Sequence, residues 1–289
     1  MSGISEELGR KIGSATDLQS IVRSMKALAA SNIGQYEKAV GALQEYYRTV
    51  ELAVCAYSSA AGPAPRPPAA ASAHSVGALV FGSDQGLVGR FNEVLAELAT
   101  TTLSALPGRT TRIWAVGERM AALLPTSARL FAAPNSVDAI GDLVGEILMD
   151  IAAAEEAGKI REMYLFHNSP RTGAMYVPVA RRLLPLDARW QSDMAAIHWP
   201  TGQIPEVIQG EKTALEAFVR EYLFILLFQA CAESLASENA SRLAAMQRAE
   251  KNIEDMLEEM NRRFHRIRQE SIDEELFEVI SGYDSLAQD

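Results

Sequence analysis

The sequence EKTALEAFVREYLFILLFQACAESLASENASRLAAMQRAEKNIEDMLEEMNRRFHRIRQESIDEELFEVIS, which runs from Glu211 to Ser281, decides the fold of this chain. These 71 residues contain neither proline nor glycine, the two residues that most often interrupt a helix. One continuous helix of this length would measure roughly 105 Å, several times the diameter of a small domain. Such a helix cannot bury its own apolar stripe, so the sequence predicts that it has a partner.

Apolar side chains along this stretch recur at alternating steps of three and four residues. Toward the C-terminal end the series is Ile253, Leu257, Met260, Phe264, Ile267 and Ser271, and upstream it is Leu215, Phe218, Tyr222, Ile225 and Gln229. This spacing is typical of the seam of a coiled coil. The alternative is a long amphipathic helix that lies on a globular core. A second helix of similar length would decide between the two.

The first 58 residues supply that second helix. No proline occurs from Ile4 to Ser58, and a second seam with strict steps of three and four runs through Ala15, Leu18, Val22, Met25, Ala29, Asn32, Tyr36, Ala39, Leu43, Tyr46, Val50, Ala53 and Tyr57. Helices at the two ends of a chain can pair antiparallel when the residues between them fold as a compact unit. We expect paired residue numbers to sum to roughly 285. That register would place Cys55 near Cys231, without a disulfide.

Two segments of different composition lie between these helices. Residues 59–75 carry four prolines among alanines, which predicts an extended linker. Residues 76–210 then alternate short apolar runs with helical patterns. The predicted strands are Val76–Phe81, Arg112–Val116, Arg129–Ala132 and Met163–His167, and the predicted helices are Phe91–Leu106, Glu118–Leu124 and Val137–Ala157.

Such alternation predicts a layer of helices on a mainly parallel sheet. The predicted fold class is therefore α+β. In this fold, the helices of residues 1–58 and 211–289 form a long antiparallel coiled coil, and residues 76–210 form a central Rossmann-like α/β domain.

Composition narrows the classes of function. The chain is 48% apolar and 22% charged, as soluble globular proteins are, and its net charge of −10 argues against a general nucleic-acid binder. No apolar run is long enough to cross a membrane and the N-terminus has no secretory pattern, so we expect a protein that is cytosolic or peripheral on a cytosolic membrane face. Two cysteines and four scattered histidines provide no metal-ligand spacing. We therefore expect neither a metal nor a cofactor.

One loop is a possible ligand site. Residues Ser83–Asn92 read SDQGLVGRFN, directly after the first predicted strand and before a predicted helix. A glycine-bearing turn of this kind can bind phosphate on free amides, but the loop has neither the three-glycine dinucleotide fingerprint nor the lysine of a P-loop. The alternative is that Ser83 or Asp84 closes the turn. No nucleophile or acid/base pattern occurs elsewhere, so we expect no catalytic residue in this chain.

Unpaired cations are the remaining feature that suggests a function. Four arginines lie within seven residues near the C-terminus: Arg262, Arg263, Arg266 and Arg268. The first three have a glutamate four residues away along the helix, whereas Arg268 has no acidic residue at three or four positions. Arg23 and Lys26 also lack one. These cations form either a solvated face or a contact with an acidic partner surface.

Four segments of this chain together form a recognisable set of motifs. They are IVRSMKALAAS at residues 21–31, SDQGLVGRFN at 83–92, ASENASRLAAM at 236–246, and RQESI at 268–272 followed by ELFEVI at 275–280. These segments closely resemble signatures of the F-type ATP synthase gamma subunit. The four matches keep the order and spacing of the family over nearly the whole chain. Departures at residues 32–37, at Asp273 and at residues 282–285 suggest a divergent, alternative-type ATPase.

The resemblance implies a central-stalk rotor subunit, present once in a hetero-oligomer, without an active site of its own. Its paired helices would stand inside a ring of alpha and beta subunits and its α/β domain would form a foot with the epsilon subunit on the c ring. Rotation would couple ion translocation to ATP synthesis or hydrolysis. The protein would lie on the cytoplasmic side of the cell inner membrane and meet the membrane only through the c ring. The alternative function is a coiled-coil adaptor whose α/β domain binds a small ligand.

The same resemblance implies contacts for individual residues. Arg268 and Gln269 match residues that meet the catch region of the ring. Three others match positions near the acidic lever segments of the beta subunits: Met25, Lys26 and Arg242. Candidate foot contacts are Gln85, Arg90, Ile197, His198 and Trp199.

Overall fold

The computed structural model describes residues 2–61, 75–106, 110–125, 128–172, 174–186, 190, 196–197, 199–201, 203 and 211–286. Most of the predicted linker at 59–75 lies outside these residues, as does His198. Two compact units are formed, one by Met1–Ala29 with Arg242–Asp289 and the other by Ala30–Ser241. Helix α1 spans Ser2–Ala61 and helix α6 spans Glu211–Leu286, so each helix contributes residues to both units.

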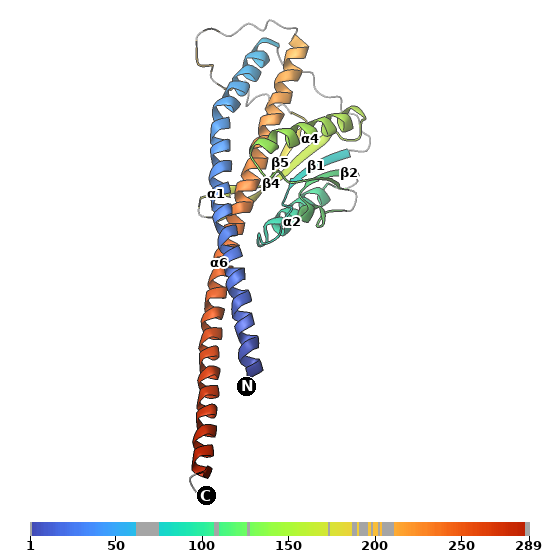
Figure 1. The fold of residues 1–289 in the computed structure, drawn as a ribbon. Helices are drawn as coiled ribbons and strands as arrows, with labels where there is room; N and C mark the ends of the chain where they lie inside the picture. Colours follow the sequence, from blue (N-terminus) through green and yellow to red (C-terminus); the bar gives the residue numbers. More distant parts are fainter. Residues whose placement is uncertain are drawn as a thin grey trace. The chain divides into compact units, whose positions relative to one another are not determined.

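In the first unit, the ends of α1 and α6 run antiparallel, side by side (Figure 1). Val22, Met246 and Ile253 form a buried apolar cluster, and Met25 and Leu257 pack against its margin. The predicted seams therefore meet here, as the step of three and four residues requires. Leu18 is an exception, because its side chain is 47% exposed although the pattern assigned it to the seam.

The register of the two helices differs from the predicted one. Arg23 contacts Glu250, and their residue numbers sum to 273 rather than to roughly 285. In the second unit, the hydroxyl of Tyr46 donates a hydrogen bond of 2.7 Å to Glu221. The turns of α1 that follow Tyr46 thus face the start of α6, so Cys55 does not lie opposite Cys231.

Seam periodicity cannot detect such a difference. Sliding one helix along the other by a whole heptad leaves every seam position facing the partner. Both thiols are free and buried, and Cys55 Sγ instead donates to the carbonyl of Ile197 at 3.4 Å.

A five-stranded sheet in the order β3-β2-β1-β4-β5 forms the centre of the second unit. Its strands are β1 (Ser75–Phe81), β2 (Thr110–Val116), β3 (Arg129–Phe131), β4 (Glu162–Arg171) and β5 (Ala174–Leu184). The first four run parallel to one another, and all four were predicted from the sequence. The Rossmann-like prediction is confirmed in this part of the sheet.

The fifth strand was not predicted. β5 pairs antiparallel with β4 and lies at the edge of the sheet, and Pro178 stands opposite Asn168. Proline has no N–H for a ladder hydrogen bond and is therefore tolerated only on edge strands. The segment after Pro170, with prolines at 178 and 185, shows only turn and extended signals in the sequence, so no strand was assigned there.

Helices cover both faces of the sheet (Figure 1). Leu79 and Phe81 of β1 pack in the cluster that includes α4 (Asp138–Glu156) and α6, whereas Ala78 and Val80 pack with α2 (Phe91–Ser104) and α3 (Glu118–Ala121). Successive strand residues point to opposite faces, so a continuous apolar run is what a doubly covered strand needs. Across the described residues, no helix combines the length and the apolar character that crossing a membrane requires.

We expect Gly117→Ala to destabilise the α/β unit by about 1–3 kcal/mol. Gly117 joins β2 to α3 with φ at 98°, and a Cβ there would lie 2.5 Å from the main-chain carbon of Ser83. Gly141→Ala in α4 is the control, because its Cβ would meet nothing within 4 Å, and helix propensity should make this variant neutral or slightly stabilising. Urea unfolding followed by circular dichroism compares them, and equal midpoints would contradict the argument.

Candidate functional site

A row of buried serines attaches α6 to the sheet. Ser234, Ser237 and Ser241 are 3%, 0% and 3% exposed, and their spacing places them on one face of the helix. Their hydroxyls donate to the carbonyls of Phe81, Asn168 and Val88 at 3.0, 3.1 and 2.5 Å, respectively. A buried hydroxyl is costly without a partner, so these hydrogen bonds fix how α6 is turned toward the sheet.

The loop after β1 is closed by its own side chains. Asp84 Oδ1 accepts the amide hydrogen of Glu118, and Oδ2 accepts that of Ala133, both at 2.9 Å. Asn92 and Ser83 bond reciprocally: Asn92 Nδ2 donates to the Ser83 hydroxyl at 2.8 Å, and the Ser83 amide donates to Asn92 Oδ1 at 3.0 Å. The turn-closing alternative is thus confirmed for this loop. Asp84 thus ties the loop to the first residue of α3 and to the segment that follows β3.

The candidate foot residues lie in separate places. Gln85 and Arg90 are exposed in the loop, where Arg90 pairs with Glu97 at 3.0 Å. The carbonyl of Ile197 accepts the Cys55 thiol, and Trp199 Nε1 donates to Thr201 Oγ1 at 2.9 Å. His198 lies outside the described residues. Within the described part of the chain, no three His, Cys, Asp or Glu side chains are placed to hold a metal ion.

The predicted cations of α1 have partners on α6. Arg23 contacts Glu250 at 2.9 Å and Glu254 at 3.4 Å, and Lys26 Nζ lies 2.5 Å from the second oxygen of Glu250. Lys26 and Arg23 lower the pKa of Glu250 through these hydrogen bonds, and Glu250 in turn raises the pKa of Arg23. The prediction that Lys26 is unpaired is therefore wrong. It rested on neighbours within one helix, whereas the partner of Lys26 lies on the other helix.

Near the C-terminus, Arg268 differs from the arginines around it. Arg262 pairs with Glu258 at 2.7 Å and Arg266 with Glu270 at 3.0 Å, whereas Arg268 makes no ion pair among the described residues. Gln269 beside it is also exposed. A groove of about 670 Å³ between the first turns of α1 and residues 264–275 of α6 is lined in part by Arg268.

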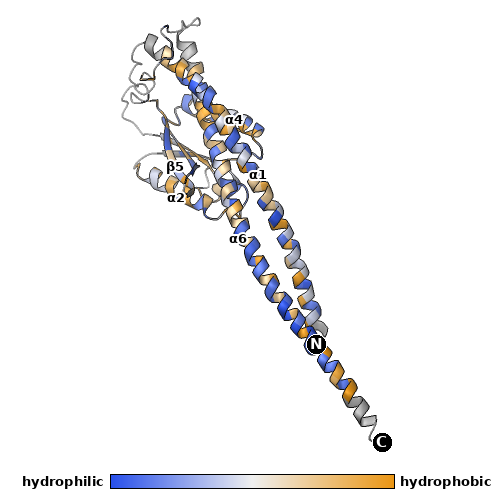
Figure 2. Ribbon diagram, turned by 90° about the vertical axis from the view of Figure 1, so that its left-hand side faces the viewer, coloured by the Kyte–Doolittle hydropathy of each residue, from blue (hydrophilic) through white to orange (hydrophobic). Residues whose placement is uncertain are grey.

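The end of α6 is apolar and exposed, which the sequence reasoning did not identify. A Cβ on Gly9 would lie 3.8 Å from Phe264, so the last turns of α6 extend past the N-terminus of α1 (Figure 2). Their large apolar side chains are 48–70% exposed: Ile272, Leu276, Phe277, Val279 and Ile280. The sequence does contain a sign of this feature, because apolar residues continue in α6 beyond the point at which the seam residues of α1 could pair with them.

The other two residues assigned to the ring lie close to the helix seam. Met25 packs against the cluster of Val22, Met246 and Ile253, and Arg242 is half-buried. Within the first unit, Met25 and Lys26 thus lie beside the cluster of Val22 and Met246, whereas Arg268 and Gln269 lie toward the C-terminal end of α6.

Comparison with known proteins gives consistent results. A family model described as "ATP synthase" matches residues 5–286. The ATP synthase gamma chain of Methylorubrum populi is 29% identical over 97% of this chain and 99% of its own length, and that of Methylorubrum extorquens (strain PA1) is 30% identical over 72% and 73%.

Solved structures show the same fold. A chain of the Euglena gracilis mitochondrial ATP synthase rotor has a TM-score of 0.62 at 14% identity, with 94% of this chain and all of that one covered. A chain of the OSCP/F1/c-ring assembly from the same organism has a TM-score of 0.66 at 14% identity, with 99% and 95% covered.

We expect Ser237→Ala to destabilise the α/β unit by about 1–2 kcal/mol, because the buried carbonyl of Asn168 loses its donor. Pro178, which stands opposite Asn168, has no N–H to replace it. Ser20→Ala is the control, since that exposed hydroxyl bonds to Thr16 of its own helix and its loss should change stability by less than about 0.5 kcal/mol. Chemical denaturation measures both, and equal effects would argue against a role for the serine row.

We expect the helix pair to lose stability in acid through Glu250. Its pKa in the folded chain is below its ordinary value of 4.5. The stabilisation is therefore complete well above that value and is lost as the pH falls from about 5 through the folded pKa.

Thermal unfolding of Glu250→Gln should accordingly depend less on pH in this range than that of the unchanged protein. Glu258→Gln removes the same charge from α6 without touching α1, and it should weaken the helix pair less. Parallel pH profiles for Glu250→Gln and the unchanged chain would contradict the assignment.

Proposed function

The chain belongs to the family of ATP synthase gamma subunits, and on this basis we propose that it is the central-stalk rotor of an F-type ATP synthase or ATPase. The observation that carries the proposal is the agreement with gamma chains over nearly the full length of both sequences. The gamma chain is a non-catalytic subunit of that complex. In this role, rotation of the subunit couples ion translocation to ATP synthesis or hydrolysis in other subunits.

The physical properties of the helix pair suit torque transmission. α1 and α6 are continuous helices of 60 and 76 residues. An apolar seam and the ion pairs of Glu250 resist sliding of one helix against the other in the first unit. The serine row resists rotation of α6 against the sheet in the second unit. The adaptor alternative has no comparable observation in its favour.

We propose that the contacts with the alpha and beta subunits are made by Met25, Lys26, Arg242, Arg268 and Gln269. Arg268 is the best supported, because it is exposed and has no ion-pair partner among the described residues. Lys26 already pairs with Glu250, but its side chain remains 36% exposed, so it could contact another subunit while it keeps this ion pair. The exposed apolar end of α6 would fit an apolar surface of the ring.

The remaining parts of the proposal concern the foot. The α/β domain of residues 76–210 would meet the epsilon subunit and the c ring, with Gln85, Arg90, Ile197, His198 and Trp199 as candidate contacts. The subunit would be present once per complex, on the cytoplasmic side of the cell inner membrane. The other parts of the proposed domain organisation are the two coiled-coil helices, at residues 1–58 and 211–289, and the linker at residues 59–75.

Reconstitution with purified alpha and beta subunits tests the proposal. The unchanged chain should raise assembly and ATPase activity, whereas Arg268→Ala should lower turnover by up to about tenfold, as expected for the loss of one charge-assisted hydrogen bond. Arg262→Ala is the matched control, because Glu258 already pairs with that arginine. No gain from the unchanged chain would contradict the rotor function, and equal effects of the two variants would contradict only the contact assignment.

A seam variant separates loss of contact from loss of folding. Phe264 is half-buried, so Phe264→Ala should destabilise the helix pair by about 1–2 kcal/mol, less than the 3 kcal/mol or more of a fully buried phenylalanine. Arg268→Ala should leave thermal unfolding unchanged, because Arg268 contributes no seam contact.

A further inference from the structure

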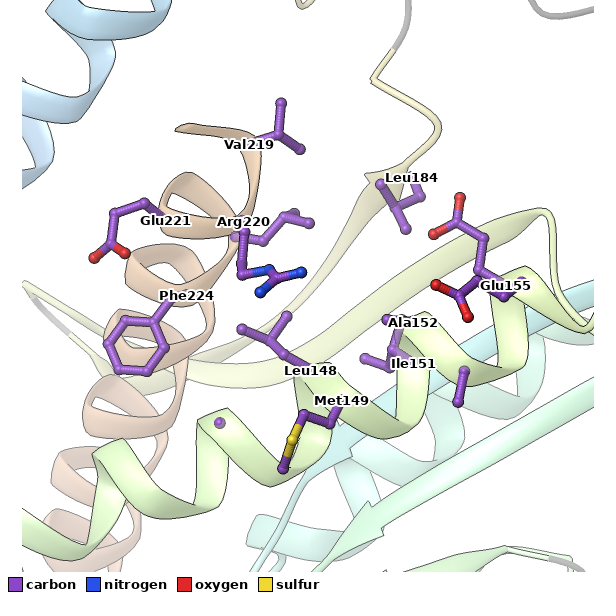
Figure 3. A pocket seen from close by; sticks show the side chains of 14 residues that line it. Leu148, Met149, Ile151, Ala152, Glu155, Leu184, Val219, Arg220, Glu221 and Phe224 are labelled. Atoms are coloured by element: carbon purple, nitrogen blue, oxygen red, sulfur yellow. The ribbon is translucent and has the colours of Figure 1, made fainter. Parts of the chain in front are cut away.

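A groove of about 740 Å³ lies in the second unit between α4 and residues 219–224 of α6 (Figure 3). Its walls are largely apolar, with Leu148, Ile151 and Ala152 from α4 facing Leu223 and Phe224 from α6. This volume is within the range of sites that bury a bound group. Met149 at its margin is 69% exposed, which is unusual for a large apolar side chain on a well-packed helix.

Two carboxylates lie on the α4 side of the groove. Glu155 and Glu156 are exposed in the last turn of α4, where no basic residue is present. The C-terminal end of a helix carries a partial negative charge, so carboxylates there are unfavourable and a cation is favoured. Neither glutamate makes an ion pair within the described chain, and Lys159, which follows four residues after Glu155, does not neutralise it.

An arginine occupies the opposite side. Arg220 of α6 turns its guanidinium toward α4, whereas Glu221 points away from the groove (Figure 3) and accepts the hydroxyl of Tyr46. Arg220 is exposed and makes no ion pair with any described residue. The groove thus holds an apolar floor between an unpaired cation and two unpaired anions.

Together these features define what the groove can bind. A ligand needs an apolar surface for the floor, a basic group for Glu155 and Glu156, and an acidic group for Arg220. An amphipathic helix meets all three needs, because residues three and four apart share its apolar face and charges flank that face. Opposite charges on the two sides also fix the direction in which such a helix can lie.

We propose that this groove docks an amphipathic helix of another subunit of the same assembly, with a lysine or arginine of that helix against Glu155 and Glu156. The inference rests on the proposed function and names an interface outside the expected contacts of the loop at Gln85–Arg90 and of residues 197–199. It assigns to α4, a helix that otherwise only covers the sheet, a role in assembly.

Cysteine labelling in the full chain tests the proposal. Met149→Cys supplies a reactive thiol, while Cys55 and Cys231 are buried, and burial raises the pKa of Cys231 so that its thiol reacts slowly. A maleimide should label Met149→Cys readily in the free subunit and at least about tenfold more slowly in the purified complex. Leu123→Cys, at a position 45% exposed outside the groove, reports whether assembly itself slows labelling.

Charge variants test the chemistry of the partner. Replacing both Glu155 and Glu156 by glutamine should restore labelling of Met149→Cys in the complex at least several-fold. The matched control replaces Glu93 and Glu97, two exposed carboxylates of α2, and should leave the protection unchanged. Equal effects of the two double variants would overturn the proposed charge pairing.

A photo-reactive group at position 149 in the purified complex identifies the occupant. A cross-link to an apolar segment of another subunit, with a lysine or arginine within one helical turn, is the expected result. A cross-link within this chain, to a second copy or to lipid would overturn the proposal, as would undiminished labelling of Met149→Cys in the complex. If such a complex keeps its ATPase activity, the rotor function stands and only the docking site fails.

Discussion

The rest of the second unit depends on the hydrogen bonds that buried serines of α6 donate to main-chain carbonyls of the α/β unit. A helix can lie this close to the backbone of its neighbours only where its side chains are small, and alanines at 232 and 236 accompany the serines there. These hydroxyls supply donors to buried main-chain carbonyls, and the carbonyl of Val88 also accepts the amide hydrogen of Phe91. Three polar contacts at fixed spacing therefore determine the rotational setting of α6, which apolar packing alone would leave less well defined.

The same helix uses a different chemistry in the first unit. From Met246 onward, its buried side chains are apolar and recur at seam spacing, and Glu250 supplies the polar contacts from the edge of the seam. One uninterrupted helix thus packs on the α/β unit through apolar side chains and a row of serines, and on α1 through an apolar seam. The segment ASENASRLAAM, at residues 236–246, spans the change from one chemistry to the other. Most of its polar residues hold the fold, and Arg242 is the member assigned to the ring.

Periodicity within one segment could be predicted from the sequence, whereas relations between segments could not. Apolar runs identified β1, β2 and β4 because strands covered on both faces are continuously apolar, a weaker run identified the edge strand β3, and Asp84 was recognised as a residue able to close its loop. The helix register was wrong because a shift by heptads preserves the pattern. β5 was missed because its edge position, which makes Pro178 tolerable, is a property of the sheet. The partners of Lys26 were missed because they belong to the other helix.

These differences separate two kinds of cation that look alike in the sequence. Arg23 and Lys26 face the carboxylates of Glu250 and Glu254 across the seam, so their charges hold the two helices together. Arg268 lies further toward the C-terminus than these ion pairs, near the point where α6 extends past the end of α1. There, the guanidinium makes no ion pair with any described residue, and the apolar side chains that follow are exposed as well. An exposed apolar helix end beside a cation that has no ion-pair partner among the described residues is the kind of surface that marks an interaction site.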